Sequence, residues 1–270
     1  MTVTNVGGTT GLGMSSTKSW AADPADFNRD GRQDVLIVYH DRGAKLWRND
    51  GGHFTAVQTF PATTIWPNGR PGNIDRHDCA WGDPNRDGLP DVYCTVGRTG
   101  LNIVKPANLD NELWLQQPGG SFQEAGTSWG VGDPFGRGRT AVFLDANGDG
   151  LPDLYVANET PRPQDPDRLT KGQNQLFLNV AGTHFVADPT NHFGLDGFIG
   201  YGKRAIAFDY NGDGWQDLLV TGAARPYLYV NNAGQGFTEI GMRAGLTVHY
   251  VDVALADVTG DGRPDLIAET

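Results

Sequence analysis

The sequence predicts an all-β protein, a β-propeller of four-stranded antiparallel blades, and three observations support this expectation. One short acidic loop, with the pattern D-x-(N/T)-x-D-G-x-x-D, occurs five times along 270 residues. Each copy is followed by a run of β-branched, aromatic or aliphatic residues, a composition that favours strands. The 38 Gly and 16 Pro suit many short strands joined by turns, not long helices. We therefore expect a single propeller domain over residues 1–270 with about five repeat units.

The spacing of the loops agrees with one loop per blade. The loops span residues 26–34, 83–91, 145–153, 209–217 and 257–265, and successive loops begin 57, 62, 64 and 48 residues apart. A kelch-type blade is about 50 residues long. Each spacing is thus close to the length of one blade.

Four strands are expected in each unit. Apolar runs such as those from Thr140 and Arg204 precede the loops, and β-rich runs such as that from Val35 leave them. In four of the five units a further pattern follows, as from Lys45 to Phe54, with alternating apolar residues, a turn and a closing Phe. This pattern is typical of a hairpin. One aromatic position recurs in these hairpins and is expected in the core: Trp47, Trp114, Phe177 and Tyr229.

The two ends of the chain carry matching patterns. Residues 3–12 align with residues 237–246, with two glycines and a leucine in register. We therefore expect an N-terminal strand to close the last blade, which removes exposed sheet edges. The sequence ends at Thr270, before a fifth hairpin. Either the fifth blade is reduced to three strands or the chain is part of a longer ring, and we favour the five-unit interpretation.

Each acidic loop offers oxygen ligands suited to Ca²⁺, which takes six to eight of them. Positions 1, 3, 5 and 9 supply side-chain oxygens, position 7 a backbone carbonyl, and the glycine at position 6 permits a left-handed turn. Mg²⁺ prefers a more rigid octahedron, so Ca²⁺ is the expected cofactor, with up to five ions. The predicted ligands are Asp26, Asn28, Asp30, Arg32, Asp34, Asp83, Asn85, Asp87, Leu89, Asp91, Asp145, Asn147, Asp149, Leu151, Asp153, Asp209, Asn211, Asp213, Trp215, Asp217, Asp257, Thr259, Asp261, Arg263 and Asp265.

Two other interpretations of the loops were weighed. An EF-hand requires Glu at position 12 of its loop, and here that position holds Ile37, Cys94, Val156, Val220 or Ala268. EF-hands are therefore excluded. The loops could instead be simple Asx-turns without metal, but the ninth-position Asp is present in all five copies, and this favours metal binding.

The net charge is consistent with bound cations. Fifteen of the 32 acidic residues lie in the five loops, and five Ca²⁺ ions would almost neutralise the net charge of −11. No cluster of Lys and Arg among aromatic residues is present, so nucleic acid is not an expected partner. No apolar run is long enough to span a membrane.

The only two cysteines, Cys79 and Cys94, flank the second loop. If this loop joins two antiparallel strands, the two residues face each other and a cross-strand disulfide can form. A pair of reduced, buried cysteines is the alternative.

The loops, their flanking strands and the Leu-Trp-type hairpins resemble the FG-GAP/VCBS repeats of integrin α-subunit propellers and bacterial secreted proteins. The segment from Asp75 to Cys94 further resembles repeats of the cartilage acidic protein branch. The resemblance implies a propeller with calcium loops between consecutive strands, in an extracellular, secreted or cell-surface setting. The fifth loop departs from it by having Thr259 where Asn is usual, so its site is expected to be the weakest.

Function is expected to lie in the connections. Residues 60–78, 99–110 and 160–173 interrupt the repeat and are expected to form long loops on one face, where a protein or glycan ligand would bind. We favour a non-catalytic binding or adhesion module, for which no catalytic residues are assigned. The alternative is a propeller enzyme, a polysaccharide lyase or hydrolase, using loop residues such as His77, Tyr201 and Arg204. The oligomeric state is not predicted.

Overall fold

The computed structural model describes residues 10–12, 19–39, 43–61, 63–65, 71–97, 110–134, 136–159, 173–188, 190–195, 204–222, 224–250 and 252–269. Within these described residues the secondary structure consists of β-strands, with no helix. In chain order they are β1 (Ser19–Ala25), β2 (Asp34–Tyr39), β3 (Gly43–Asn49), β4 (Phe54–Phe60), β5 (Thr63–Ile65), β6 (Pro71–Asn73), β7 (Arg76–Gly82), β8 (Asp91–Val96), β9 (Glu112–Gln116), β10 (Phe122–Glu124), β11 (Gly138–Leu144), β12 (Asp153–Asn158), β13 (Gln175–Val180), β14 (His184–Ala187), β15 (Ala205–Phe208), β16 (Asp217–Thr221), β17 (Pro226–Asn231), β18 (Phe237–Glu239), β19 (Asp252–Ala256) and β20 (Asp265–Glu269). The all-β prediction is confirmed.

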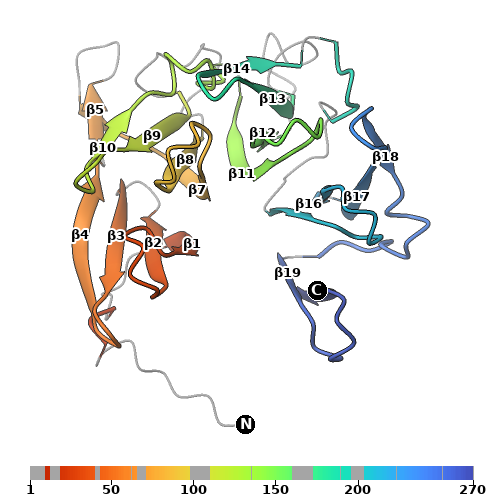
Figure 1. The fold of residues 1–270 in the computed structure, drawn as a ribbon, viewed down its shortest axis with the longest axis horizontal. Coiled ribbons are helices and arrows are strands. Elements are labelled where there is room, and N and C mark those ends of the chain that lie inside the picture. Colours follow the sequence, from red (N-terminus) through yellow and green to blue (C-terminus); the bar gives the residue numbers. More distant parts are fainter. Residues whose placement is uncertain are drawn as a thin grey trace.

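The strands form four antiparallel sheets of four strands, which are the predicted blades. Blade 1 is β1–β4, blade 2 is β7–β10, blade 3 is β11–β14 and blade 4 is β15–β18, each with its strands hydrogen-bonded in chain order. Figure 1 shows the blades following one another around a common centre. The first strands are the inner neighbours, since β1 contacts β7, β7 contacts β11 and β11 contacts β15.

The fifth unit is described only as the two-stranded sheet of β19 and β20. A separate short hairpin, β5–β6, lies within the 60–78 connection that we expected to be a loop. The β-branched run from Thr63 to Ile65 accounts for its first strand. None of the described segments forms a helix that could cross a lipid bilayer.

The hydrophobic core lies between neighbouring blades. Val92 and Cys94 of β8 pack against Leu36 and Leu46 of blade 1, whereas the intervening Tyr93 packs toward blade 3. Every residue of β8 is therefore buried, as expected for a strand with both faces covered. Of the four recurring aromatic residues, Phe177 and Tyr229 are buried, but Trp47 and Trp114 are only half-buried.

The cysteines lie directly opposite each other on β7 and β8. Cys79 and Cys94 are joined by a disulfide, with their Cα atoms 4.1 Å apart. The bond therefore links the two strands that the second acidic loop connects.

The first described residues contact the fourth strand of blade 1 in the same way that an inter-blade turn contacts the fourth strand of blade 3. The Thr10 carbonyl accepts a hydrogen bond from the Phe54 amide, as the Trp129 carbonyl does from Phe185. Gly11 has φ +86°, in the left-handed region that favours glycine. The strand expected to close the last blade falls on residues 1–9, which lie outside the described residues.

Polar contacts join the first strands near the centre of the ring. Thr140 donates a 2.6 Å hydrogen bond to Asp78 and accepts one of 3.2 Å from the Ala205 amide. Arg204 then pairs with Asp252 of β19 at 3.3 Å. Blades 2 to 5 are thus linked in sequence.

Two carboxyl groups near this chain of contacts are poorly accommodated as anions. Burial, together with the charge of Asp78, raises the pKa of Asp23, and burial raises the pKa of Asp78. The positive charge of Arg204 lowers both values in part. The Oδ2 atom of Asp23 is buried and has no hydrogen-bond partner in the described structure.

We predict that Asp23→Asn stabilises the protein at pH 8 but not at pH 4. A raised pKa means that the folded protein retains the proton, so this group's favourable contribution is complete near pH 4 and is lost as the pH rises toward the folded value. Asparagine does not titrate. At pH 8 the free energy of unfolding of the variant should therefore exceed that of the parent protein by more than about 1.4 kcal/mol, the equivalent of one pKa unit.

Urea unfolding of both proteins at the two pH values measures this difference. Asp50→Asn serves as the control. Hydrogen bonding to Arg48 lowers the pKa of Asp50, so this variant should become less stable relative to the parent protein as the pH rises. An equal effect of Asp23→Asn at both pH values would contradict the assignment.

Candidate functional site

All five acidic loops occupy the same place in their sheets. Each joins the first strand of a blade to the second, as between β1 and β2 or β7 and β8. In an antiparallel sheet the hairpin turn between the third and fourth strands lies at this same end. The connections between second and third strands, which include residues 99–110 and 160–173, begin and end at the opposite end. The strand ends that flank these connections therefore lie on the face opposite the acidic loops, whereas most of residues 99–110 and 160–173 lie outside the described residues.

The glycine at position 6 makes the expected turn in every loop. These residues have φ between 79° and 88°: Gly31, Gly88, Gly150, Gly214 and Gly262. The residue at position 4 is also left-handed in all five loops, and in the first two it is an arginine, Arg29 or Arg86. This backbone aims the amide groups of each loop inward.

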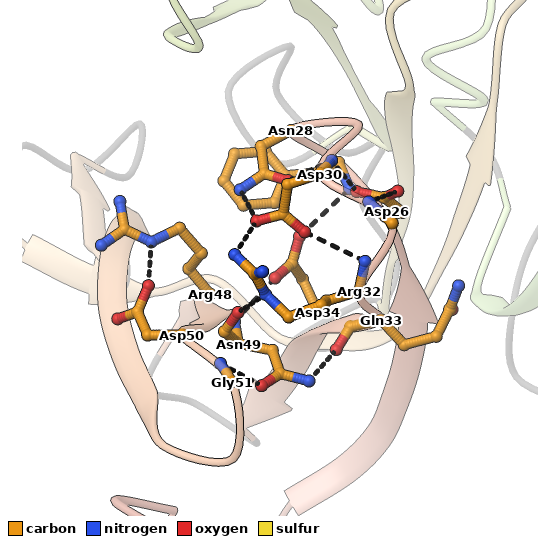
Figure 2. Close-up of polar contacts among 12 residues, drawn as sticks. Asp26, Asn28, Asp30, Arg32, Gln33, Asp34, Arg48, Asn49, Asp50 and Gly51 are labelled. Atoms are coloured by element: carbon orange, nitrogen blue, oxygen red, sulfur yellow. Dashed lines mark hydrogen bonds and ion pairs between the residues drawn. The ribbon is translucent and has the colours of Figure 1, made fainter.

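The aspartates at positions 1 and 5 accept hydrogen bonds from their own loop, which therefore folds around these two carboxylates, as Figure 2 shows for the first loop. Asp26 accepts hydrogen bonds from the amides of Asp30 at 3.0 Å and Gly31 at 2.7 Å. Asp30 accepts from the Arg32 amide at 3.0 Å and from the Asn28 side chain at 2.9 Å. The Asn-to-Asp side-chain contact recurs in loops two to four.

The aspartate at position 9 of the loop anchors the loop to its sheet. In blade 3, Asp153 accepts the Ala146 amide of the loop at 3.0 Å and the Asn179 amide of the third strand at 2.8 Å. Its side chain is fully buried. Burial raises the pKa of Asp153 to about 7, and the charges of Asp149 and Asp145 add to the increase.

Loop two lacks one of these hydrogen bonds. Its second residue is Pro84, which has no amide hydrogen, so Oδ2 of Asp91 is buried without a hydrogen-bond partner in the described structure. The pKa of Asp91 is raised to about 7, chiefly by burial. A buried, unpartnered carboxylate oxygen is costly unless a cation or a donor compensates it.

The donor chemistry of the loops fits a hard cation. Loops one to four each contain three carboxylates and an asparagine amide at position 3, with no nitrogen or sulfur donor among the predicted ligands. As they stand, no three Asp, Glu, His or Cys side chains in the described residues converge closely enough to hold a metal ion. The carboxylates are instead directed at loop amides.

Loop five differs from the others. Asp265 accepts hydrogen bonds from the amides of Val258 and Thr259 within the loop, but in the described residues β20 has no third strand beside it that could donate another. Hydrogen bonding to Thr259 lowers the pKa of Asp265, opposite to the direction at Asp153. This loop is the most weakly supported of the five.

Side-chain amides lock loops one to three to the following blade, and the sequence analysis missed them. The Asn179 side chain donates to the Pro84 carbonyl of loop two at 2.9 Å and to Pro152 of its own loop at 3.1 Å. Its Oδ1 accepts the Gly182 amide at 2.9 Å. The signal was an Asn or Gln that ends the third strand of each complete blade: Asn49, Gln116, Asn179 and Asn231.

His77 belongs to a buried network on the other face. Its Nδ1 lies 2.8 Å from the Gly138 carbonyl and its Nε2 lies 3.1 Å from Asp75. Arg139 contacts the ring and also pairs with Glu159. β-Bulges at His77 and Arg139 bring these two side chains together across β7 and β11.

The structure does not gather the residues of the enzymatic alternative. His77 bonds within the network just described, whereas Arg204 pairs with Asp252 on β19. Tyr201 lies outside the described residues. The two described residues therefore belong to separate networks.

Comparison with known proteins agrees with this architecture. A family profile described as FG-GAP-like repeat matches residues 26–94 and 209–268. No curated protein sequence matched the chain.

Among solved structures, an Agrocybe aegerita lectin that recognises non-reducing terminal N-acetylglucosamine is 20% identical, with a TM-score of 0.51 and 94% of this chain aligned to 60% of that one. A Bacillus licheniformis rhamnogalacturonan lyase is 15% identical, with a TM-score of 0.42, 89% of this chain and 49% of that chain covered. The Dos1 propeller is 11% identical, with a TM-score of 0.41 and coverages of 82% and 46%. The chain thus spans 60% or less of each.

We predict that Asn179→Ala lowers the free energy of unfolding by about 2–4 kcal/mol, because three hydrogen bonds are lost and buried backbone groups are left unpaired. Urea denaturation measures the loss. Asn232→Ala is the matched control, since Asn232 is exposed and, in the described residues, its side chain bonds only to Thr238; it should change stability by less than about 0.5 kcal/mol. Equal losses for the two variants would contradict the locking role.

Proposed function

Since this chain is a β-propeller built from FG-GAP-like repeats, we propose that it is an extracellular, calcium-stabilised binding module for a protein or glycan ligand. The observation that carries the proposal is that the carboxylates at positions 1 and 5 are anchored by the same loop amides in all five loops, at the same end of every blade. Such repetition favours a shared ligand over five independent turns.

In this proposal the first, third, fifth and ninth side chains of each loop, with the seventh carbonyl, hold one Ca²⁺. The ion supplies positive charge that offsets the mutual repulsion of the loop carboxylates. Side chains of the protein hold each loop in position. Asp153 joins its loop to the third strand, and Asn179 joins loop two to blade 3, so order in one loop stabilises the adjacent blade.

The Cys79–Cys94 disulfide supports the extracellular assignment. Disulfides persist in oxidising compartments and are rare in the cytosol. Extracellular fluid also supplies the calcium that loops of modest affinity require.

A binding role agrees with the way the fold presents its connections. The β8–β9 and β12–β13 connections leave one face of the ring, where loops carried on a rigid scaffold commonly form recognition sites. The Agrocybe aegerita lectin shows that a related architecture accommodates glycan recognition, although a fold alone does not fix a ligand.

Calcium removal tests the proposal. We expect elemental analysis to find several Ca²⁺ per chain and a chelator to lower the melting temperature strongly. When the free Ca²⁺ concentration is about 100 times the Kd of a site, binding at that site adds about 2.7 kcal/mol to the free energy of unfolding. Asp149→Asn should reduce the calcium content by one ion, whereas Asp188→Asn, outside the loops, should leave it unchanged. No bound calcium and an unchanged melting temperature would overturn the proposal.

The fifth loop should release its ion first as calcium is lowered, because Thr259 replaces the Asn of the other loops and Asp265 has no third-strand anchor in the described residues. Thr259→Asn restores an amide oxygen and should strengthen the weakest site severalfold in a calcium titration by calorimetry. If the variant leaves every phase of the titration unchanged, the ranking of the loops is wrong.

A further inference from the structure

On the face that carries the acidic loops, the hairpin turns of blades 2 to 4 differ in how closely they approach the loop of the preceding blade. In blades 3 and 4 the hairpin turn packs directly on the preceding acidic loop. A Cβ atom at Gly182 would lie 3.4 Å from a backbone oxygen of loop two, and one at Gly234 only 2.6 Å from a backbone oxygen of loop three. In blade 2, by contrast, Gly119 and Gly120 have no atom within 4 Å of that position. The turn of blade 2 therefore stands away from loop one.

A change in one residue type accompanies this difference. Asn179 and Asn231 use Oδ1 to bind a glycine amide of their own turn, at 2.9 Å and 2.8 Å. Blade 2 has the longer Gln116, whose Nε2 still reaches the Phe27 carbonyl of loop one at 3.2 Å. Its Oε1 is buried and accepts no hydrogen bond in the described structure, and only 4% of the residue is exposed. The interaction that closes the turn in blades 3 and 4 is thus missing here.

Gln116 lines a cavity of about 470 Å³ between blades 1 and 2, within the size range of small-molecule sites. Its apolar lining comes from Phe27, Val57 and Leu89. Arg29 also lines it, with its guanidinium beside loop two.

Further amides line the same cavity, those of Gln58 and Gln117. Arg48 completes the charged lining but is paired with Asp50 at 2.6 Å. The site therefore combines an apolar surface, several amides and one arginine, Arg29, that makes no ion pair within the described residues.

We propose that this cavity binds a neutral, hydroxyl-rich unit, namely one sugar residue of a glycan. Hydroxyls of the sugar would accept from Arg29 and Gln117, and a rotation of the Gln116 side chain that exposes its Oε1 would let a further hydroxyl donate to that atom. The C–H face of the ring would pack on Phe27 and Val57. The carboxylates of loops one and two disfavour an anion at this position, and Arg29 disfavours a cation.

This inference rests on the proposed binding function and refines it. It places a ligand on the acidic-loop face, between blades 1 and 2 (Figure 1), instead of on the face of the long connections. The corresponding spaces beside blades 3 and 4 are closed by their own asparagines. Of blades 2 to 4, only blade 2 would therefore carry this site, although all three share the repeat.

Saturation-transfer NMR and calorimetry on the full chain in calcium-containing buffer test the inference. The probes are D-glucose, D-galactose, D-mannose, L-fucose and N-acetyl-D-glucosamine, with D-glucuronate as the anionic comparison. We expect saturable binding of at least one neutral sugar. Gln116→Met should weaken it about tenfold, and Val57→Trp, which fills the cavity from an exposed strand position, should abolish it. Gln123→Met is the control for the same replacement at an exposed site on β10.

The outcomes separate this inference from the binding function on which it rests. Binding that survives both Gln116→Met and Val57→Trp, in variants that melt like the parent protein, places the ligand elsewhere and overturns the site alone. Stronger binding of glucuronate than of every neutral sugar overturns the ligand class. If no neutral sugar binds while calcium content and thermal stabilisation are as expected, the inference fails and the calcium-stabilised module stands.

Discussion

The buried aspartate that ends each acidic loop is the contact on which the architecture depends. In blades 1 to 4 it is the first residue of the second strand and is fully buried. One of its oxygens accepts an amide from the third strand, and in three of these blades the other accepts an amide from the loop. The same carboxylate therefore fixes the shape of the loop and the position of the hairpin. Because a buried anion is costly, this arrangement makes loop electrostatics a determinant of blade stability.

The side-chain amides extend that dependence from one blade to the next. Asn179 and Asn231 each bond to the loop of the preceding blade and to their own loop. Near the centre, Thr140 and Arg204 make a second series of links between first strands. Neighbouring blades are thus coupled at the loop face and at the inner strands, in addition to their hydrophobic contacts. Disorder in one loop removes an anchor from the following blade as well as from its own.

Much of the fold could be predicted from the sequence because its signals are local. The acidic loops, the strands beside them and the hairpins were recognisable from short-range patterns, and the spacing of Cys79 and Cys94 indicated a cross-strand pair. The network of His77 with Arg139 and Glu159 could not be predicted, since it joins residues 62 and 20 positions apart through bulges. The role of the third-strand amides was visible as a recurrence but not as a contact.

A binding site that is found at one repeat of a repeat protein and not at the others must come from residues that depart from the repeat. Where Asn ends the third strand, its short side chain satisfies the turn and the turn packs on the neighbouring loop. One additional methylene, in Gln116, accompanies an unpartnered Oε1 and an open gap. Pro84 has a similar effect on Asp91, because it removes an amide that the other loops provide. In both places a single substitution leaves a buried polar atom unpartnered within an otherwise repeated framework. The framework keeps that atom in position because the rest of the blade still obeys the repeat, and this is the condition under which a local exception becomes a specific site.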